Sequence, residues 1–411
     1  MKRITIDQPR LWNSLMSMGE LGGLPGGGCC RLALSAEDGA GRDLFVTWAR
    51  EAGCEIAIDE VGNIYARRPG RMENAPAVAT GSHLDTQPHG GKFDGIYGVL
   101  AGLEVVRALN DANVVTERPI DVIVWTNEEA ARFLPPLTGS STFAGVHSSA
   151  FVHAIETVDG TRVGDDLRAI GYLGDEVPGS RALDSFFEAH IEQGPILEAE
   201  SKTIGVVTQV QGLRFFAVSV VGEDGHGGTL PMTARRDAMT GAARMIVALD
   251  DLARGTDGAV RMTVGSLQVY PNSGSTVPGA VDFTIDLRHP DAATLEQLEG
   301  TFRAMLADIA TRAKLEVDIT LKMVKQPIHF DPDIQASIAR SAEALGFPSR
   351  AILSGAGHDA MNLATLVPTG MIFIPCAGGI SHNERESAEP ADLAAGAGVL
   401  LRAMLERANR P

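Results

Sequence analysis

The hydrophobic pattern of the chain predicts an α/β protein. Short apolar runs, expected as buried strands, alternate with longer stretches whose apolar residues recur every three or four positions, as in amphipathic helices. The runs predicted as strands up to residue 200 are residues 54–58, 63–66, 76–80, 120–125 and 183–190. The stretches predicted as helices are residues 6–18, 35–51 and 98–110. We therefore expect a mixed sheet flanked by helices.

The pattern changes near residue 208. Residues 215–221, 264–270, 280–287 and 315–322 resemble antiparallel strands, and two helical stretches, 233–253 and 293–313, lie between them. This β-α-β-β-α-β order is that of a split βαβ, or ferredoxin-like, domain. A helix at 333–345, a strand at 369–374 and a helix at 389–409 then resume the first pattern. We expect one α/β domain, residues 1–208 with 326–411, and an α+β domain inserted at 209–325.

Polar side chains follow the predicted strands where each strand ends. Because α/β sheets place their sites at the carboxyl ends of strands, we expect these side chains to meet. They are His83, Asp94, Glu128, Glu129, His190 and His382. Two or three histidines with carboxylates and no thiols suit Zn, Mn, Co or Ni. A carboxylate shared between two ions would give a two-metal hydrolytic site.

Individual residues in this set favour particular roles. Glu128 and Glu129 are adjacent, so their side chains point to opposite sides, and one can bind a metal while the other takes a proton. Asp85, two residues after His83, can accept the proton on the second ring nitrogen of that histidine. Spacing alone leaves two alternatives open, namely a solvated acidic loop at Glu128 and a surface position for His83.

Composition and charge narrow the classes of function. The chain has 411 residues, of which 44% are hydrophobic, and a formal net charge of −17. This charge argues against nucleic acid and anionic membrane as partners. Four cysteines without paired spacing make a zinc–thiolate site and a disulfide framework improbable. We see no secretion signal and no apolar run long enough to span a membrane, so we expect a cytoplasmic protein.

Five long motifs carry a family resemblance. They are GSHLDTQPHGGKFDGIYGVLAGLEV from Gly81, WTNEEAARF from Trp125, HIEQGPILEAESKTIGVVTQVQG from His190, SGAGHDAMNLA from Ser354 and PCAGGISHNERE from Pro375. With them the chain resembles, nearly end to end, the hydantoinase/carbamoylase branch of the metal-dependent aminoacylase/carboxypeptidase superfamily. That branch contains N-carbamoyl-L-amino acid hydrolases, bacterial β-ureidopropionases and allantoate amidohydrolases.

The resemblance implies a metal centre with two divalent ions. Asp94 would bridge the ions, His83 and His190 would bind one of them, and Glu129 and His382 would bind the other. In the same way it implies that Glu128 is the general base and that Asp85 orients His83. The first domain would be catalytic, and the inserted domain would be a lid that also forms a homodimer.

Substrate contacts implied by the resemblance lie mostly in the inserted domain. His226 matches a histidine that stabilises the tetrahedral intermediate, usually in the neighbouring subunit's site, although its flanks read G-H-G-G-T-L-P-M instead of A-H-A-G-T-T-P-M. Arg288 matches the arginine that binds a substrate carboxylate, for which a bidentate guanidinium is suited. Gln193 and the backbone at Gly357 match further contacts.

One departure from the family pattern concerns the substrate. Ser275 stands where the family has a substrate-binding asparagine, and Asn272 could replace that residue only if the loop is shifted. A serine hydroxyl has a shorter reach than an asparagine amide. His358 and Asp359 form another His-Asp pair, which we leave out of the metal set as structural.

The expected activity is hydrolysis of the carbamoyl amide of an N-carbamoyl-L-amino acid, α or β, to the amino acid, ammonia and carbon dioxide. The alternatives are an allantoate amidohydrolase and an N-acyl amino acid or peptide hydrolase. A non-catalytic binding protein on the same scaffold would lack metal ligands or the base, and none is missing from this sequence.

Overall fold

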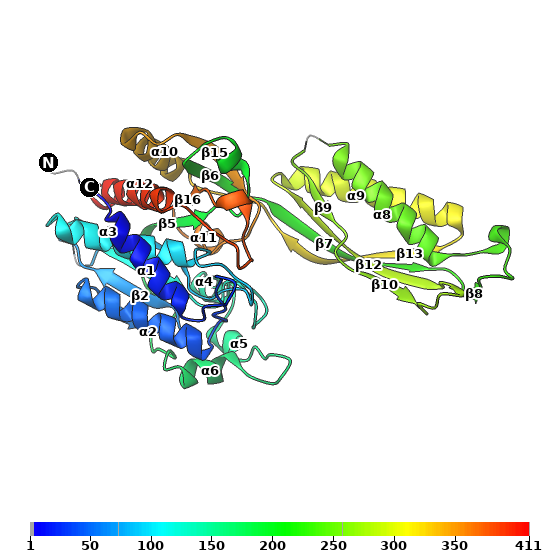
Figure 1. Ribbon diagram of the computed structural model, residues 1–411, viewed down its shortest axis with the longest axis horizontal. Coiled ribbons are helices and arrows are strands. Elements are labelled where there is room, and N and C mark those ends of the chain that lie inside the picture. Colours follow the sequence, from blue (N-terminus) through cyan, green and yellow to red (C-terminus); the bar gives the residue numbers. More distant parts are fainter. Residues whose placement is uncertain (1–3, 73, 257, 411) are drawn as a thin grey trace. The chain divides into compact units, whose positions relative to one another are not determined.

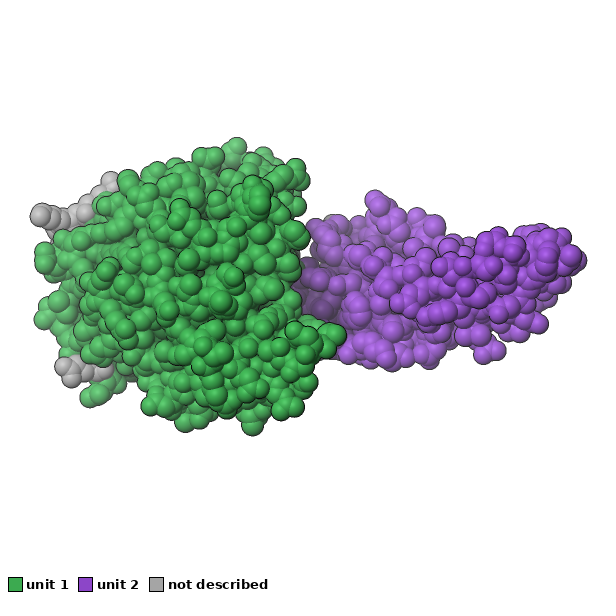
Figure 2. Space-filling model, turned by 60° about the horizontal axis from the view of Figure 1, so that its bottom comes forward, with its two compact units in different colours: residues 1–208, 329–411 green, residues 209–328 purple. Residues whose placement is uncertain are grey.

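The computed structural model describes residues 4–72, 74–256 and 258–410. The chain divides into two compact units, Met1–Thr208 with His329–Pro411 and Gln209–Ile328 (Figure 2). The second unit ends at Ile328, whereas the sequence pattern places the end of the insertion at residue 325.

Unit 1 contains a nine-stranded mixed sheet in the order β1-β2-β4-β3-β5-β16-β6-β14, with β15 paired to β6. Strand β3 is parallel to β4 and β5, and β16 is parallel to β5, whereas β2 and β6 run antiparallel to their neighbours β4 and β16. The strands are β1 (Glu55–Ile58), β2 (Ile64–Arg68), β3 (Ala77–His83), β4 (Ile120–Trp125), β5 (Leu183–Ile191), β6 (Ile204–Val210), β14 (Ile328–His329), β15 (Ser349–Ser354) and β16 (Thr369–Ile374).

The central strands of unit 1 are covered on both faces. Every residue of β3, β4 and β16 is buried, which is the usual state of parallel strands between two layers of helices. The longer helices are α1 (Gln8–Glu20), α2 (Ala36–Glu51), α3 (Ile96–Asp111), α10 (Pro332–Leu345) and α12 (Pro390–Ala408). Helices α3 and α12 pack against each other and against β3 and β5 (Figure 1).

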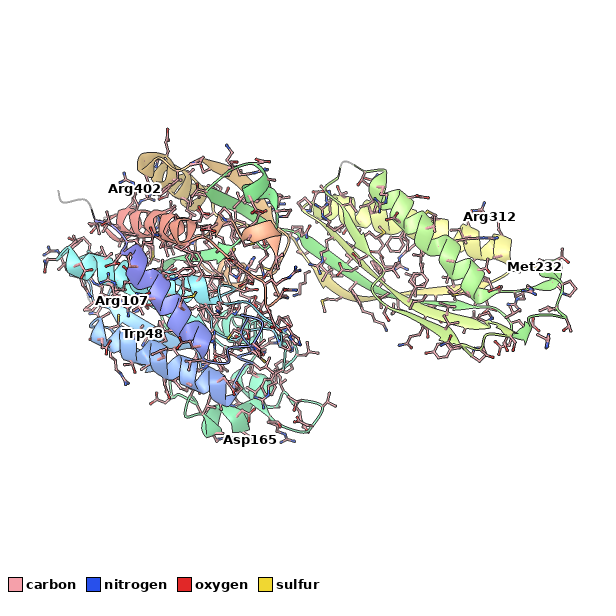
Figure 3. All side chains as sticks on the ribbon, viewed as in Figure 1. Trp48, Arg107, Asp165, Met232, Arg312 and Arg402 are labelled. Carbon is pink, nitrogen blue, oxygen red and sulfur yellow. The ribbon has the colours of Figure 1, made fainter. Side chains whose placement is uncertain are left out.

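Side chains fix the ends and faces of these helices. Ser35 caps α2 by accepting a hydrogen bond from the backbone of Asp38, as the sequence predicts for an N-cap. The guanidinium of Arg107 on α3 lies 5.7 Å from the ring centroid of Trp48 on α2, so a cation–π contact joins the two helices (Figure 3).

Unit 2 has a five-stranded antiparallel sheet in the order β10-β12-β7-β13, with β9 also paired to β12. Burial alternates along β12, and its buried residues share one core with residues of helices α8 and α9. Figure 1 shows both helices on the same side of this sheet. A separate two-stranded ribbon joins β8 to β11. The elements are β7 (Gly212–Val221), β8 (Gly225–His226), η1 (Met232–Ala234), α8 (Ala238–Arg254), β9 (Arg261–Thr263), β10 (Leu267–Tyr270), β11 (Thr276–Val277), β12 (Ala280–His289), α9 (Ala292–Ala313) and β13 (Glu316–Lys325).

The predicted α/β class with a mixed, helix-flanked sheet is confirmed. The strands at 120–125 and 369–374 form at the predicted bounds. The segment 264–270 forms only the strand β10, and the helix expected from residue 233 begins at Ala238, after the 3-10 turn η1. The sequence pattern did not predict the strands β6, β14 and β15 of unit 1. It also did not predict several short helices, which are α4 (Thr138–Phe143), α5 (Ser149–His153), α6 (Val163–Ala169), α7 (Ile196–Ala199), α11 (Ala360–Leu363) and η2 (Ala377–Gly379). None of the helices in the described segments has the length and apolar character needed to cross a membrane.

Candidate metal and catalytic site

The polar side chains at the strand ends converge in unit 1. His83 is the last residue of β3, Glu128 and Glu129 follow the end of β4, and His190 lies near the end of β5. Because β3, β4 and β5 are parallel neighbours, their carboxyl ends meet at one edge of the sheet. His382 reaches the same place from the loop that follows β16 and η2.

One group of possible ligands consists of His83, Asp94 and His190. Their ligand atoms all lie within 4.8 Å of one another, and all three residues are buried. Oδ1 of Asp94 lies 3.8 Å from Nε2 of His83 and 3.1 Å from Nε2 of His190. The three atoms are therefore close enough for a single metal ion to bind them together.

The backbone fixes the orientation of both imidazoles. Nδ1 of His83 lies 2.8 Å from the carbonyl of Asp85, and Nδ1 of His190 lies 2.9 Å from the carbonyl of Ile191. A carbonyl only accepts, so the proton of each ring in its neutral form sits on Nδ1, and Nε2 is the atom left to bind a metal ion. Burial lowers the pKa of His190, but the hydrogen bond and charge of Asp94 outweigh burial and raise it to about 9.

A second group consists of Asp94, Glu129 and His382. Nε2 of His382 lies 3.3 Å from Oδ2 of Asp94 and 3.4 Å from Oε2 of Glu129. The two groups share Asp94, whose Oδ1 faces the first group while its Oδ2 faces the second. This geometry suits a carboxylate that bridges two ions.

The donor set fits divalent metal ions. Imidazole nitrogens and carboxylate oxygens suit borderline and hard cations, and crowded buried carboxylates require positive charge. Burial, followed by the charge of Asp94, raises the pKa of Glu129 to about 7. A third group, Glu188, His190 and His358, is also close together. There the two oxygens of Glu188 accept hydrogen bonds from the hydroxyl of Ser82 and the backbone N–H of Ala360.

Glu128 belongs to neither group that shares Asp94. Its Oε2 lies 3.7 Å from Nε2 of His83, and the residue is buried. Burial, together with the charges of Asp359 and Glu129, raises the pKa of Glu128 well above its ordinary value. A buried carboxyl group with a raised pKa beside a candidate metal centre has the properties of a general base.

Asp85 was expected to contact His83 through its side-chain carboxylate, but it does so through its backbone carbonyl oxygen. Its backbone carbonyl holds Nδ1 of His83, whereas its carboxylate lies 3.9 Å from that nitrogen. The carboxylate instead accepts hydrogen bonds from the backbone N–H groups of Glu128 (3.3 Å) and Glu129 (3.2 Å). Asp85 thus contacts both the histidine and the glutamate pair.

Two glutamine amides contact the possible carboxylate ligands. Nε2 of Gln193 donates to Oδ2 of Asp94 (2.8 Å), and Nε2 of Gln87 donates to Oε2 of Glu129 (2.8 Å). Gln193 was expected as a substrate contact, and that role stays a prediction. Sequence reasoning gave Gln87 no role in the site, although it lies in the motif that starts at Gly81.

Several non-glycine residues of the site adopt a left-handed backbone. The φ angles are +54° for Asn127, +54° for Gln193 and +52° for His382. Such conformations are costly outside glycine and persist where the surrounding structure holds them. The amide of Asn127 donates to the carbonyls of Phe133 and Pro135, which holds the chain beside Glu128 in this form.

The His358–Asp359 pair, taken from the sequence as structural, packs beside the ligands. The rings of His358 and His190 pack edge to face with their centroids 4.6 Å apart, and Nε2 of His358 lies 2.8 Å from the hydroxyl of Ser354. Asp359 is buried and accepts a hydrogen bond from Ser140. Gly357 lies in the same loop, between β15 and α11.

The remaining expected contacts lie in unit 2. Nδ1 of His226 accepts hydrogen bonds from the backbone of Gly228 (3.0 Å) and Thr229 (3.2 Å), so the proton of the neutral ring is on Nε2. The carbonyl of Ser275 accepts from Gly227 (2.7 Å), which places Ser275 beside the turn of His226.

Arg288 and Asn272 also lie in unit 2. Arg288 donates two hydrogen bonds to Asp286, at 2.8 and 2.9 Å, so a carboxylate of this chain already occupies one edge of the guanidinium. Asn272 follows β10 with a φ of +56°. The roles of these residues in substrate binding stay predictions.

Comparisons with known proteins agree along the whole chain. Residues 79–406 match the family model described as peptidase family M20/M25/M40. An N-carbamoyl-L-amino-acid amidohydrolase from Rhizobium meliloti is 44% identical over 99% of this chain and 98% of that protein. An allantoate amidohydrolase from Escherichia coli is 34% identical over 97% of both. The crystal structure of a hydantoinase/carbamoylase family amidase from Burkholderia multivorans has a TM-score of 0.96 and 50% identity, with 99% of both chains covered.

Proposed function

Because the chain belongs to peptidase family M20/M25/M40, and within it to the hydantoinase/carbamoylase amidases, we propose that it is an N-carbamoyl-L-amino-acid amidohydrolase. The single observation that carries the chemistry is the convergence of two ligand groups on Asp94, with Glu128 beside them. The relative named for this activity is 44% identical, against 34% for the relative named for allantoate, so the carbamoyl substrate is favoured over allantoate.

The reaction adds water to the carbamoyl carbonyl and breaks the bond to the amino acid nitrogen. The amino acid leaves with a proton, and the carbamic acid that remains separates into ammonia and carbon dioxide. The net reaction consumes one water, and its first step requires a base for the attacking water and a proton for the leaving nitrogen.

The family is metal-dependent, and the residues present fit two divalent ions. We assign one ion to His83, His190 and Asp94, and the other to Asp94, Glu129 and His382. Bound ions of this kind polarise a carbonyl and lower the pKa of water. Zn, Mn, Co and Ni all suit such a set, so we leave the metal open.

Glu128 would take the proton of the attacking water and deliver it to the leaving nitrogen. Its burial supports this role, because a carboxyl group with a raised pKa can hold the proton between the two steps. The position of Asp85 is consistent with this role for Glu128, since the carboxylate of Asp85 accepts a hydrogen bond from the backbone N–H of Glu128.

For substrate binding, we assign the oxyanion contact to Nε2 of His226, which the backbone bonds to its Nδ1 leave as the donor. Arg288 would bind the substrate carboxylate, with Asp286 as its partner in the free enzyme. We further assign contacts to the groups that the family pattern indicates, which are Gln193, Asn272, Ser275 and Gly357. A homodimer in which His226 serves the neighbouring subunit, and a location in the cytoplasm, are parts of this proposal.

The test measures ammonia released by the Mn²⁺-loaded protein from N-carbamoyl-L-methionine, N-carbamoyl-β-alanine and allantoate. N-acetyl-L-methionine, followed through free methionine, tests the acyl hydrolase alternative. We expect a carbamoyl amino acid to be hydrolysed. Turnover of allantoate alone would replace the proposal with the ureide activity, and no turnover of any substrate by metal-loaded protein would refute it.

A Glu128→Gln variant tests the base. We expect kcat to fall about 10²- to 10⁴-fold, the usual contribution of general acid–base catalysis. Its metal content should equal that of the wild type, because Glu128 is in neither ligand group around Asp94. A variant that keeps its activity would show that another group takes the proton.

A further inference from the structure

The turn that carries Asp94 is held by a carboxylate that lies outside both ligand groups. Oε1 of Glu386 accepts hydrogen bonds from the backbone N–H groups of Phe93 (2.9 Å) and Asp94 (3.1 Å). Glu386 is only 7% exposed. Removing its carboxylate would leave two buried N–H groups without this acceptor, which is a costly loss.

The same carboxylate also contacts the turn of His382. The hydroxyl of Ser381, the residue directly before His382, lies 2.9 Å from Oε2 of Glu386 and 2.9 Å from Oδ2 of Asp94. Glu386 is therefore joined both to the backbone of the shared ligand and, through one hydroxyl, to its carboxylate. It connects two turns that supply ligands to the same candidate ion.

Gly91 provides the space that Glu386 occupies. A Cβ atom at residue 91 would lie 1.9 Å from Oε1 and 2.0 Å from Cδ of Glu386. These distances are far below van der Waals contact, and the buried glutamate side chain has little room to move away. The glycine is thus required by the position of Glu386, which links the motif beginning at Gly81 to the one beginning at Pro375.

We propose that Glu386 is a positioning residue of the metal centre. It fixes the backbone of Asp94 and the hydroxyl of Ser381 so that the two oxygens of Asp94 face the two ligand groups. The action is geometric: the side chain at position 386 must supply an acceptor for the two N–H groups and a hydrogen-bond partner for Ser381. This inference rests on the proposed function for the metal centre, but not on which substrate is hydrolysed.

The test is titration of the metal-free protein with Mn²⁺, with metal affinity and stoichiometry as readouts that need no activity. In Glu386→Ala we expect affinity for Mn²⁺ to fall about 10- to 100-fold, as when other partners of metal ligands are removed. Glu386→Gln keeps an acceptor oxygen for both N–H groups and can donate to Ser381, so it should bind Mn²⁺ within about threefold of the wild type.

Three further variants and one control complete the design. Gly91→Ala should weaken Mn²⁺ binding as Glu386→Ala does, and the double variant should be little worse than either one. If circular dichroism shows that Glu386→Ala is unfolded, Glu386→Asp, which is one methylene too short to keep all three bonds, takes its place. Glu384→Ala is the matched control, since Glu384 pairs with the exposed His89 and should leave Mn²⁺ binding unchanged.

Each outcome decides the inference. Wild-type affinity in folded Glu386→Ala or Glu386→Asp would refute it. Equal losses in Glu386→Gln and Glu386→Ala would also refute it, because they would show that Glu386 acts through its charge. Failure of the proposed function would look different: the wild type would bind Mn²⁺ in a Glu386-dependent way and hydrolyse no carbamoyl substrate.

Discussion

At the scale of single residues, backbone groups do much of the positioning in the metal centre. Backbone carbonyls bind Nδ1 of His83 and His190, and the carboxylates of Asp85 and Glu386 bind backbone N–H groups. These contacts leave the Nε2 atoms of both histidines close to Oδ1 of Asp94, within one candidate ligand group. The orientation of each ligand thus depends on how its own turn is held.

Asp85 allows this dependence to be tested. In Asp85→Ala the carbonyl that holds His83 remains, but the N–H groups of Glu128 and Glu129 lose a buried acceptor. We expect kcat/KM to fall about 10- to 100-fold. The orientation of His83 should persist, so a crystal structure of the variant should show the ring in its original place. A rotated His83 ring would instead assign the main role to the carboxylate.

The site residues that are easiest to predict from the sequence are those that lie at the end of a strand. His83, His190 and the glutamate pair belong to that class, because the chemistry of the residue and the end of an apolar run coincide. Gln87 and Glu386 do not follow from any periodicity, since their partners lie in other loops. The short spacing between Asp85 and His83 suggested a contact, but it could not tell a side-chain oxygen from a backbone oxygen.

At the scale of elements, helix α3 depends on close approach to the sheet. A Cβ atom at Gly98 would lie 2.5 Å from the carbonyl oxygen of Ala189 on β5 and 2.8 Å from Cβ of Ser82 on β3. Neither neighbour can move without shifting a buried strand. This glycine therefore sets how closely α3 packs behind the strands that carry His83 and His190.

Gly98→Ala should reduce the free energy of unfolding by about 1–3 kcal/mol, the usual cost of overpacking a core. Gly300→Ala is the matched control, because Gly300 is also inside a helix, α9, and nothing lies within 4 Å of its Cβ position. That substitution should stabilise the protein by about 0.4–1 kcal/mol. Urea unfolding measures both, and equal changes in the two variants would contradict the packing argument.

Helices and strands that are long enough to show a repeating pattern of apolar residues could be predicted from the sequence, whereas very short helices could not. Helix α3 and strand β4 each contain enough apolar residues to show their period. Helices α4 and α11 have six and four residues, which is too few for an amphipathic pattern to emerge. The strand expected at 264–270 shortens to β10, since Gly265, a poor strand former, lies near its start.

At the scale of the whole molecule, metal binding and stability are linked through protons. Burial and the charge of Asp94 raise the pKa of Glu129 and of Glu386 to about 7, from 4.5. The pKa values of His190 and His382 are raised to about 9, from 6.5. All four groups thus hold protons in the folded, metal-free protein at pH values where the unfolded chain has released them.

Because these four groups hold protons in the folded state that the unfolded chain releases between about pH 4.5 and 9, the stability that they contribute to the metal-free protein falls as pH rises through that window. Glu129, His190 and His382 must lose their protons to bind a metal ion, so affinity for Mn²⁺ must rise over the same window. We expect the chelator-treated protein to have a lower Tm at pH 9 than at pH 6, and Mn²⁺ to raise the Tm more at pH 9. A higher Tm for the metal-free protein at pH 9 would contradict the linkage.

The chain leaves unit 1 after Thr208 and returns to it at His329, and the position of these two points affects how the inserted unit could be exchanged during evolution. Strands β6 and β14 are neighbours in the sheet, and the backbone N–H of Phe330 donates to the carbonyl of Thr208. Strands β6 and β14 are therefore hydrogen-bonded to each other in the sheet, and a short turn could connect the end of β6 to the start of β14. Recombination can therefore replace or shorten residues 211–327, which lie between these two strands, without rethreading the sheet of unit 1.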